Sequence, residues 1–429
     1  MRIGIIGGGA AGLAAAWLLE HDHDVTLFEK DDRLGGHAHT VDVEVDGRVL
    51  AVDAGFQFFA RSAAYATFNR LLDELEVPRT TYPATLTVSR IDGTRPVAMP
   101  PFRRGRPVWA SLTPRAIVHL VRFRAFLSRL PAFLAEHDTT VTIAEYVERE
   151  RLPKAFVDDF LFPLLLAFWC VDLADFRRFA AYNALYYLGA NLPRGLTPPE
   201  QSEIPGGLRV YVDALVASLE RASLRTGAPV DSVTRDADGT LLVEAAGAQH
   251  PFDHLVLACD ARTAHDLLAP LTELAELTAQ LARFGYFDTT IAIHGDRRLM
   301  PHDERAWSVV NVRTDAAHSS LSIWSPSRGV DVFKSWVTYD DELPQPLYAT
   351  ATYRHGLIDT EYFDAQRRLR PLQGRHGVSL AGLYTADADS HESAILSAVA
   401  VAERLAPDSP RLARLTPVPA RGAERSFLS

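Results

Sequence analysis

Three glycines near the start of the chain, Gly7, Gly9 and Gly12, have the spacing of a turn that binds phosphate. The apolar residues 1–6 precede them, and an alanine- and leucine-rich run, residues 10–19, follows them. A strand that passes through such a turn into a helix brings unpaired N–H groups at the helix N-terminus against a phosphate. The first chemistry that this sequence predicts is therefore the binding of a pyrophosphate.

A carboxylate at the right distance extends this prediction to a whole dinucleotide. Residues 25–28 form a second apolar run that predicts a strand, and the run ends on Glu29, 22 residues after Gly7. In a strand–helix–strand unit, an acid at this distance can accept both hydroxyls of an adenosine ribose. Because the glycines, the strands and the acid occur in the required order, the signal is stronger than glycine spacing alone.

A second group of glycines follows this unit. Arg33 precedes the pair Gly35 and Gly36, and a strand-like run, residues 49–56, contains an Asp-x-Gly sequence that ends at Gly55. Two adjacent glycines let a second stretch of backbone approach the same pyrophosphate, although an ordinary loop can also contain such a pair.

This order of motifs resembles the flavin-containing amine oxidase and phytoene desaturase superfamily, in which the cofactor is FAD. Further blocks continue the resemblance in the same order, at residues 204–209, 228–233, 241–244, 253–259, 379–384 and 389–395. A narrower resemblance is to a bacterial subgroup described as predicted NAD/FAD-binding or FAD-dependent oxidoreductases. It is carried by residues 35–40, Phe160-x-x-Pro163, Phe168-Trp169 and His391-Glu392. Neither resemblance names a substrate.

The resemblance implies an α/β fold with a Rossmann-like FAD-binding domain, whose ββα core is of the glutathione reductase type, and a discontinuous mixed α+β substrate domain. We expect the FAD-binding domain at residues 1–80, 203–267 and 373–407. The substrate-binding domain, with a helical insertion, is expected at residues 81–202 and 268–372. Residues 408–429, which are rich in Pro and Arg, should form a loosely ordered tail.

The resemblance also assigns residues to the cofactor. In relatives, the segments at residues 228–233, 241–244 and 253–259 form a three-stranded unit that places the backbone at the position of Val230 against the adenine, and the last helix points its positive end at the flavin. Asp389 and Glu392 have the spacing of a capping box at the start of that helix. The residues expected to bind FAD are Gly7, Gly9, Ala10, Ala11, Gly12, Glu29, Lys30, Arg33, Gly35, Gly36, His37, Gly55, Phe56, Val230, Gly382, Leu383, Ser390, His391 and Ala394.

Charge and cysteine content exclude several classes of partner. The chain has 429 residues, a net charge of −10 and only two cysteines, Cys170 and Cys259. An acidic chain argues against nucleic-acid binding. The cysteines and the scattered histidines lack the spacing of metal ligands, so no metal site is predicted. So few cysteines favour a reducing compartment, and we therefore expect a cytoplasmic protein.

The first insertion between the cofactor blocks is apolar and aromatic. Thr113 and Pro114 predict the start of a helix over residues 114–134. Within this segment, apolar residues fall on one face of the helix, and arginines recur every seven residues. The apolar residues are Leu120, Phe123, Leu127, Leu130 and Leu134, and the arginines are Arg115, Arg122 and Arg129. Such a helix either contacts a membrane surface peripherally or packs on the domain with a solvated arginine edge.

The aromatic-rich residues 156–191 either line a pocket for a hydrophobic substrate or form helical core. In the second insertion, residues 289–293, 306–312 and 332–337 predict strands.

Some residues that the resemblance leads one to expect are missing. Amine oxidases of this superfamily carry a lysine that holds a water at the flavin, but residues 260–292 contain no lysine. Ser390 falls where those enzymes commonly have an aromatic residue, and Leu383 falls where the family has an acid. The chain has a single dinucleotide fingerprint, whereas flavoenzymes that NAD(P)H reduces generally have a second one. We therefore expect the organic substrate to reduce the flavin, and oxygen, a quinone or another acceptor to reoxidise it.

We therefore expect an FAD-dependent oxidoreductase that dehydrogenates, desaturates or isomerises a hydrophobic lipid, polyene or secondary metabolite. His391, Tyr384 and Lys334 are the catalytic candidates, and no general base is assigned. Two alternatives remain open: a flavin amine oxidase that forms an imine and hydrogen peroxide, and a non-catalytic FAD-binding protein.

Overall fold

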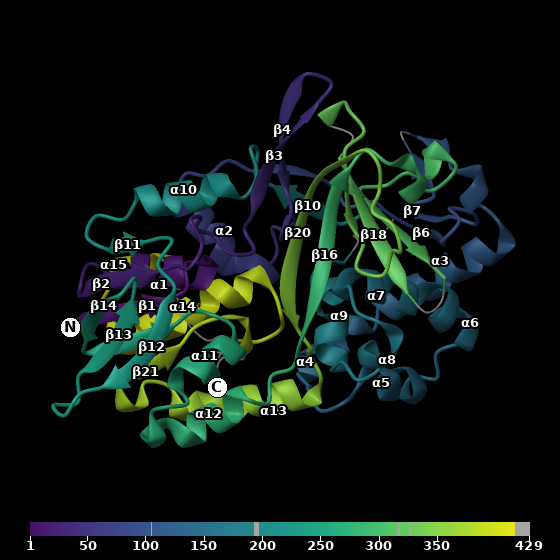
Figure 1. Ribbon diagram of the computed structural model, residues 1–429. Helices are drawn as coiled ribbons and strands as arrows, with labels where there is room; N and C mark the ends of the chain where they lie inside the picture. The colour runs from purple at the N-terminus through teal and green to yellow at the C-terminus, as the bar shows by residue number, and fades with distance from the viewer. Residues whose placement is uncertain (104, 193–196, 316–317, 326–327, 417–429) are drawn as a thin grey trace.

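A five-stranded parallel sheet forms the centre of one half of the molecule (Figure 1). The computed structural model describes residues 1–103, 105–192, 197–315, 318–325 and 328–416. In the order β11-β2-β1-β15-β21, the strands are Ser223–Arg225, Asp24–Phe28, Arg2–Ile6, His254–Leu257 and Val378–Leu380. Three distant parts of the chain therefore build one sheet. Its strands fall within the segments predicted for the FAD-binding domain, and the boundaries of that domain stay a prediction.

Helices pack closely on this sheet. Helix α1 (Ala10–Leu19) joins β1 to β2, and α14 (His391–Leu405) follows β21 and packs against α1. Every residue of α1 is buried, which explains why its sequence has no polar face. Helix α2 (Ala66–Glu74) packs on α14, and α10 (Arg209–Ala217) packs on α1. The strand–helix–strand unit predicted from the first glycines is confirmed by β1, α1 and β2.

A three-stranded antiparallel sheet stands beside the parallel one. It consists of β12 (Val230–Arg235), β13 (Leu241–Ala245) and β14 (Ala248–Phe252). The prediction that residues 253–259 supply the third strand is wrong, because β15 pairs instead with β1 in the parallel sheet. Strand β14 gave no sequence signal because a glutamine, a histidine and a proline interrupt its apolar pattern.

A seven-stranded sheet forms the centre of the other half, with the order β20-β16-β19-β18-β17-β6-β7. Its strands are β6 (Leu86–Arg90), β7 (Val97–Met99), β16 (Tyr286–His294), β17 (Val310–Thr314), β18 (Ser319–Trp324), β19 (Phe333–Trp336) and β20 (Leu347–Gly356). The strand predicted at residues 306–312 begins later, because Asp303 caps a 3₁₀ turn at Glu304–Ala306. These strands fall within the segments predicted for the substrate domain.

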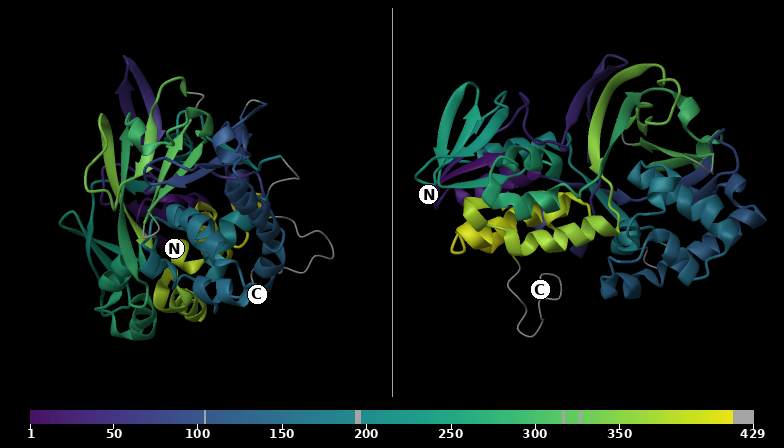
Figure 2. Two further views of the ribbon diagram at one scale, coloured as in Figure 1. Left: turned by 90° about the vertical axis from the view of Figure 1, so that its right-hand side faces the viewer. Right: turned by 60° about the horizontal axis from the view of Figure 1, so that its bottom comes forward.

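The helical insertion gathers at the end of the molecule away from the N-terminus (Figure 2, right). Helix α7 packs on β17 and β18 and so covers one face of the seven-stranded sheet. The helices are α3 (Pro114–Leu127), α4 (Leu130–Glu136), α5 (Ile143–Arg149), α6 (Lys154–Phe156), α7 (Phe162–Trp169), α8 (Leu173–Phe176) and α9 (Ala181–Ala190).

The single helix predicted over residues 114–134 is wrong. The chain forms α3 and α4 instead, because Pro131 lacks the N–H that would continue the hydrogen bonds of α3. The predicted start is correct, since Thr113 Oγ1 accepts a hydrogen bond from the Ala116 N–H at 3.2 Å. The predicted apolar face points inward, where Phe123 and Leu127 are buried.

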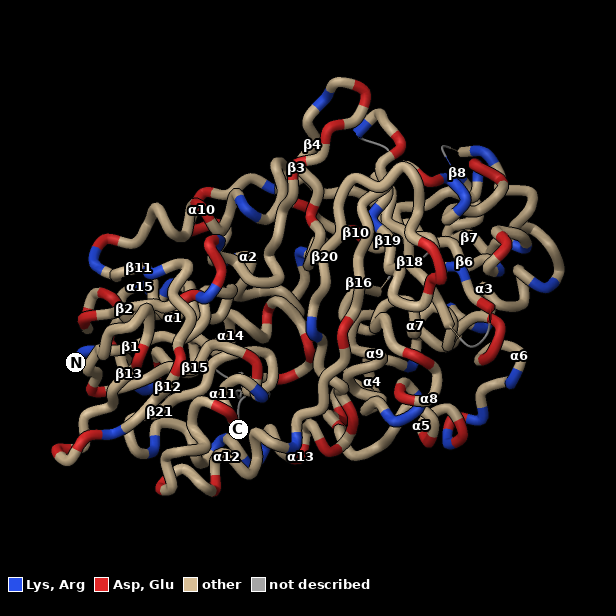
Figure 3. Tube along the Cα trace, viewed as in Figure 1, with Lys and Arg blue, Asp and Glu red and all other residues tan. Residues whose placement is uncertain are grey.

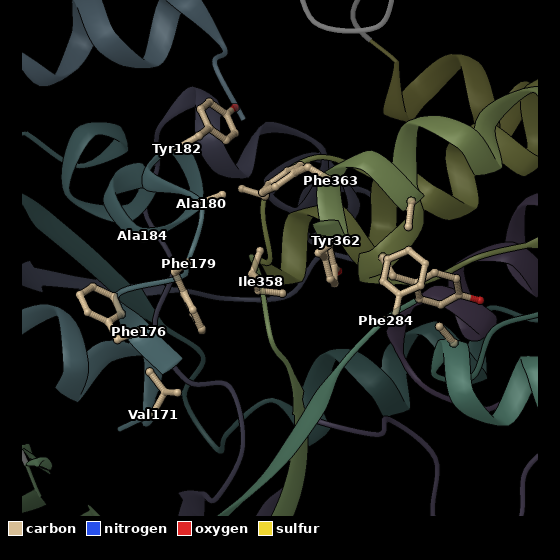
Figure 4. Close-up of a cluster of buried hydrophobic side chains, with 14 of the residues drawn as sticks. Val171, Phe176, Phe179, Ala180, Tyr182, Ala184, Phe284, Ile358, Tyr362 and Phe363 are labelled. Atoms are coloured by element: carbon tan, nitrogen blue, oxygen red, sulfur yellow. The ribbon is translucent and has the colours of Figure 1, made fainter. Parts of the chain in front are cut away.

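One hydrophobic core joins the helical insertion to the C-terminal helices. Phe176 and Phe179 belong to the same buried cluster as Phe284, Tyr362 and Phe363 (Figure 4). These last residues lie next to or within α12 (Ala275–Leu281) and α13 (Thr360–Leu369), which follow α11 (Ala261–Leu268). Several rings of the aromatic-rich insertion are therefore structural core.

Three two-stranded sheets complete the fold. They are β3 (Thr40–Val45) with β4 (Arg48–Asp53), β5 (Thr80–Pro83) with β10 (Glu200–Glu203), and β8 (Phe102–Arg103) with β9 (Arg106–Pro107). The β3–β4 hairpin projects at the top of the molecule in Figure 1.

The prediction of a loosely ordered tail from residue 408 is wrong for the first residues of that segment. Residues Pro410–Leu415 form α15, and Arg411 Nη1 donates to Glu20 Oε1 at 2.5 Å with both side chains buried. Backbone N–H groups of residues 220–222 also donate to the Glu20 carboxylate. Burial acts to raise the pKa of Glu20, but these hydrogen bonds hold it below the ordinary value. Residues 417–429 lie outside the described part of the chain.

Replacing Arg411 should therefore destabilise the fold. We expect Arg411→Met to lower the free energy of unfolding by about 3 kcal/mol at pH 7, because it leaves a buried carboxylate without its cation. The loss should shrink at acidic pH, because protonation of Glu20, whose pKa in the native protein lies below the ordinary value, removes the buried charge. Chemical denaturation across this pH range measures both effects. The control is Arg414→Met on the same helix, whose exposed ion pair with Glu74 should contribute less than about 1 kcal/mol.

Candidate active site

The first glycine turn has a backbone conformation that residues with a side chain rarely adopt. Gly7 has φ +111°, and its N–H donates to the Phe28 carbonyl at 2.8 Å. A Cβ at Gly12 would lie 1.9 Å from the Gly7 oxygen, so a larger residue would force α1 away from β1. A Cβ at Gly9 would meet no atom closer than 3.9 Å, so open space adjoins the backbone there.

Glu29 fastens this turn to the next loop. Its Oε2 accepts from the Gly8 N–H at 2.6 Å, and its Oε1 accepts from the Asp31 N–H at 2.9 Å. The Gly35 N–H then donates to the Gly8 carbonyl at 2.8 Å. A Cβ at Gly36 would lie 3.1 Å from the Gly9 Cα, so the two glycine loops approach each other closely, as the sequence predicts.

A large cavity begins at these loops and extends into the other half of the molecule. Its volume is about 1380 Å³, which exceeds the roughly 300–1,000 Å³ of an ordinary small-molecule pocket. All the residues predicted to bind the cofactor line it except Gly12, which packs on Gly7. The three catalytic candidates, His391, Tyr384 and Lys334, line it as well. The structure therefore brings the predicted residues together around one space.

His391 is held by aromatic rings at the start of α14. Its ring stacks on Phe56 with the centroids 4.5 Å apart, and its Nε2 is hydrogen-bonded to the Tyr211 hydroxyl at 2.9 Å. Burial lowers the pKa of His391 to about 3, so the imidazole is neutral at physiological pH. His391 is thus a fixed neutral group and carries no positive charge into the cavity.

The capping box predicted at the start of α14 is wrong. Ser390 is the N-cap, and its Oγ accepts from the Ser393 N–H at 3.1 Å. Glu392 turns away and accepts from the N–H groups of Thr67 and Phe68, both at 2.7 Å. It therefore ties α14 to α2, a long-range contact that local spacing could not reveal.

Lys334 lies on the sheet side of the cavity. Its Nζ donates to the Gly55 carbonyl, and it lies 5.2 Å from the centroid of the Trp336 ring. Burial lowers the pKa of Lys334 to about 8, against a smaller opposing effect of Asp53. Gly55 is itself confined, since a Cβ there would lie 2.0 Å from the His37 oxygen. Lys334 therefore links the seven-stranded sheet to the loop that carries Gly55.

Two further histidines beside this loop are also neutral. The ring centroids of His37 and His355 are 5.5 Å apart, and both residues line the cavity. Burial lowers the pKa of His37 to about 4 and that of His355 to about 3. His355 was not predicted from the sequence, because it lies at the end of β20 with no motif around it.

A buried acid, Asp389, lines the same cavity as Tyr286 and Tyr362. Burial raises the pKa of Asp389 to about 6, and burial also raises the pKa values of the two tyrosines, with a smaller contribution from the Asp389 charge. Its N–H donates to Asn183 Oδ1 at 2.8 Å, which fixes the backbone just before α14. Tyr384, also lining the cavity, has a buried hydroxyl without a hydrogen-bond partner among the described residues. Asp389 is thus able to exchange a proton near neutral pH.

A family model for flavin-containing amine oxidoreductases matches residues 10–304. The chain belongs to this family. The cofactor of this chain is therefore FAD. A curated relative, the carotenoid phi-ring synthase of Streptomyces griseus, is 25% identical over 309 residues, which cover 66% of this chain and 57% of the relative. The match thus spans little more than half of that protein.

Solved structures show the same fold at low sequence identity. The CLA-producing fatty acid isomerase from P. acnes has a TM-score of 0.68 and 16% identity, covering 94% of this chain and 98% of that one. Cyclohexylamine oxidase from Brevibacterium oxydans has a TM-score of 0.62 and 16% identity, and the match covers 94% of this chain and 99% of that one. These likenesses confirm the predicted Rossmann-like fold with its substrate domain.

The residues present fit FAD. Two glycine loops and the N-terminus of α1 can hold a pyrophosphate, and Glu29 beside them can hold a ribose. The N-terminus of α14, with Ser390 and His391, borders the same cavity. The contact that each residue makes with FAD stays a prediction.

Two absences concern only the described part of the chain. There, no group of three or more His, Cys, Asp or Glu residues is arranged to hold a metal ion. No helix there combines the length and the apolar character needed to cross a membrane.

Reversing the charge of Glu29 should prevent FAD retention. We expect Glu29→Arg to lower the FAD-to-protein ratio at least about tenfold, because it removes the acceptor for Gly8 and Asp31 and places a cation at the ribose position. The ratio is measured from the visible absorbance of the purified protein and the chromophore released by heat. Asp32→Arg, in the same loop but exposed, is the control and should retain FAD. Full flavin occupancy in Glu29→Arg would refute the assignment.

Proposed function

We propose that this enzyme uses FAD to dehydrogenate, desaturate or isomerise a hydrophobic small molecule, such as a lipid, a polyene or a secondary metabolite. The observation that carries the proposal is the part of the cavity beyond the cofactor residues, which apolar and aromatic side chains line. They come from α3, α7, α9 and the seven-stranded sheet: Leu120, Phe123, Leu127, Phe168, Trp169, Tyr186, Tyr187, Leu321, Ile323 and Trp336. Such walls exclude water and bind by apolar contact.

Several titratable side chains of the cavity carry no free charge, which suits an uncharged substrate, although Arg124, Asp288 and Arg354 also line it. His37, His355 and His391 are neutral, and the Lys334 ammonium is directed to the Gly55 carbonyl. Bound FAD supplies the hydride acceptor of the reaction. Asp389 is the group that can take or return a proton while a substrate is held against the aromatic walls. An oxidation would use oxygen or a quinone as electron acceptor, and an isomerisation needs no net acceptor.

The names of two similar proteins agree with this substrate class. One is a carotenoid phi-ring synthase and the other a fatty acid isomerase, so both act on molecules that are largely hydrocarbon. Each is distant in sequence, and the relation therefore supports the class of substrate and not its identity.

One observation favours the alternative of amine oxidation. Asp389 lines one cavity with Tyr186, Tyr187, Tyr286 and Tyr362, and a carboxylate beside aromatic rings can bind an ammonium group by charge and by contact with the ring faces. Against this alternative, residues 260–292 contain no lysine, and Ser390 stands where amine oxidases commonly have an aromatic residue. A non-catalytic FAD-binding protein is the weaker alternative, because all the glycines of the fingerprint are intact and the cavity continues past the cofactor residues.

The experiment that tests the proposal is anaerobic reduction of the bound flavin. The FAD-loaded protein is mixed with a panel of polyenes, unsaturated fatty acids and terpenoids, and in parallel with a panel of primary and secondary amines. Bleaching of the flavin absorbance, with product identification by mass spectrometry, reports the reaction, and product analysis alone reports isomerisation. Turnover of a hydrophobic compound supports the proposal. Reduction by amines only, with peroxide formed in air, would establish the alternative instead.

Asp389 gives the proposal a pH signature. With a hydrophobic substrate, the rate of flavin reduction should rise with pH through about 6 and then level off, because only the ionised carboxylate accepts a proton. We expect Asp389→Asn to lower the rate of flavin reduction at high pH about 100-fold and to abolish the rise of this rate near pH 6, as measured by stopped-flow absorbance at a series of pH values. Asp387→Asn is the control in the same loop, since Asp387 is hydrogen-bonded to Tyr182 and does not line the cavity. An unchanged profile in Asp389→Asn would exclude this role.

A further inference from the structure

Helix α3 carries apolar side chains on both of its faces. Its inner face packs into the core through Phe123 and Phe126. Its outer face exposes Ile117 by 46%, Val118 by 44% and Val121 by 63%, at spacings that place the three side chains together on one side of a helix. A helix that packs on a domain needs only one apolar face, so packing in the monomer does not account for the outer one.

The segment that leads into α3 exposes two large aromatic side chains. Phe102 is 51% exposed, and Trp109 is 68% exposed. Phe102 pairs with Pro107 in the β8–β9 hairpin, and the 3₁₀ turn that begins at Trp109 ends just before α3. We call Phe102, Trp109, Ile117, Val118 and Val121 the apolar patch. It contains half of the large hydrophobic side chains that are exposed in the described part of the chain, and such clustering marks an interaction surface.

The segment that carries the apolar patch is basic, although the protein is acidic, and one of its arginines, Arg115, is paired with Asp159 at 2.9 Å. Residues 93–135 contain eight arginines and no aspartate or glutamate, whereas the chain as a whole has a net charge of −10. Arg106 and Arg129 are exposed, and Arg122 is half-buried on α3 itself. Strand β8 and helix α3 lie together at one end of the molecule (Figure 3), which the left view of Figure 2 faces. The partner of this surface should therefore be apolar inside and negatively charged outside.

The cavity reaches the same helix from within. Leu120, Phe123 and Leu127 of α3 line it, and so do Arg124 and Ser128, which are exposed. The cavity therefore meets the surface along α3, beside the apolar patch.

We propose that the apolar patch docks on a lipid bilayer with anionic headgroups, with the mouth of the cavity against the membrane. A bilayer matches each observation: tryptophan and phenylalanine settle at the boundary between headgroups and acyl chains, and valine and isoleucine enter the apolar layer. Arginines around the patch then reach phosphate oxygens while their stems stay in contact with apolar groups. The proposal stands on this surface and does not require the proposed function to hold.

Vesicle binding by the FAD-loaded protein tests the proposal. Co-sedimentation is measured with vesicles of phosphatidylcholine alone and of phosphatidylcholine with phosphatidylglycerol. We expect binding to the anionic vesicles, weaker binding at high salt, and at least about tenfold weaker binding for the double variant Val118→Asp/Val121→Asp. The matched control is Val49→Asp, because Val49 is 70% exposed on β4, outside the patch, and should bind like the wild type. Flavin absorbance confirms that each variant is folded.

A second measurement needs no charged substitution. Phosphatidylcholine with brominated acyl chains should quench part of the tryptophan emission of the wild type, and Trp109→Phe should remove that part. Wild-type protein that fails to bind anionic vesicles overturns the proposal, and so does binding that the double variant leaves unchanged. A dimer in light scattering that the double variant dissociates, without vesicle binding, would identify a second copy of the chain as the partner and also overturns it. Flavin reduction by dispersed substrates, measured without vesicles, decides the proposed function separately.

Discussion

The contact between two glycine loops is the constraint on which the cavity depends. The Gly8 carbonyl accepts from Gly35, and Glu29 accepts from Gly8, so the turn after β1 and the loop after β2 are held as one unit. The same loop continues to His37, whose oxygen leaves no room for a side chain at position 55. Lys334 then connects Gly55 to the seven-stranded sheet. A short series of hydrogen bonds and close backbone contacts therefore determines how the seven-stranded sheet is positioned relative to the cofactor residues.

Three buried titratable groups of this cavity share one tendency, which is a shift toward the uncharged form. Burial lowers the pKa of Lys334 to about 8 and that of His391 to about 3, and it raises the pKa of Asp389 to about 6. The common cause is desolvation, which penalises a charge of either sign. It leaves Asp389 and Lys334 with pKa values on either side of neutrality, so that the protonation of both can change near physiological pH.

Local patterns predicted the cofactor half of the fold well. The glycines of residues 7–12, the acid at position 29 and the Gly35–Gly36 pair act through backbone geometry within one or two elements, so their spacing carries the information. Long-range contacts were not predictable in the same way. Glu392 accepts hydrogen bonds from α2 instead of capping its own helix, Arg411 of α15 pairs with the distant Glu20, and the pKa of Asp389 is shifted by burial, which the packing of distant segments produces. Each of these roles depends on which segments meet in space, and a spacing rule for one segment cannot express that.

Helix α14 and the residues between β21 and this helix come from the last part of the chain, yet α14 packs against the first helix and several residues between Gly382 and Ala394 border the cofactor cavity. This arrangement has a consequence for biosynthesis. A nascent chain presents the glycine turn at once, but the wall made by residues 378–394 is synthesised only after some 370 other residues. The flavin site is therefore completed only after the residues up to the start of α14 have been synthesised. Fragments that stop before β21 keep the fingerprint but lack this wall, so flavin retention reports whether a molecule extends through these residues.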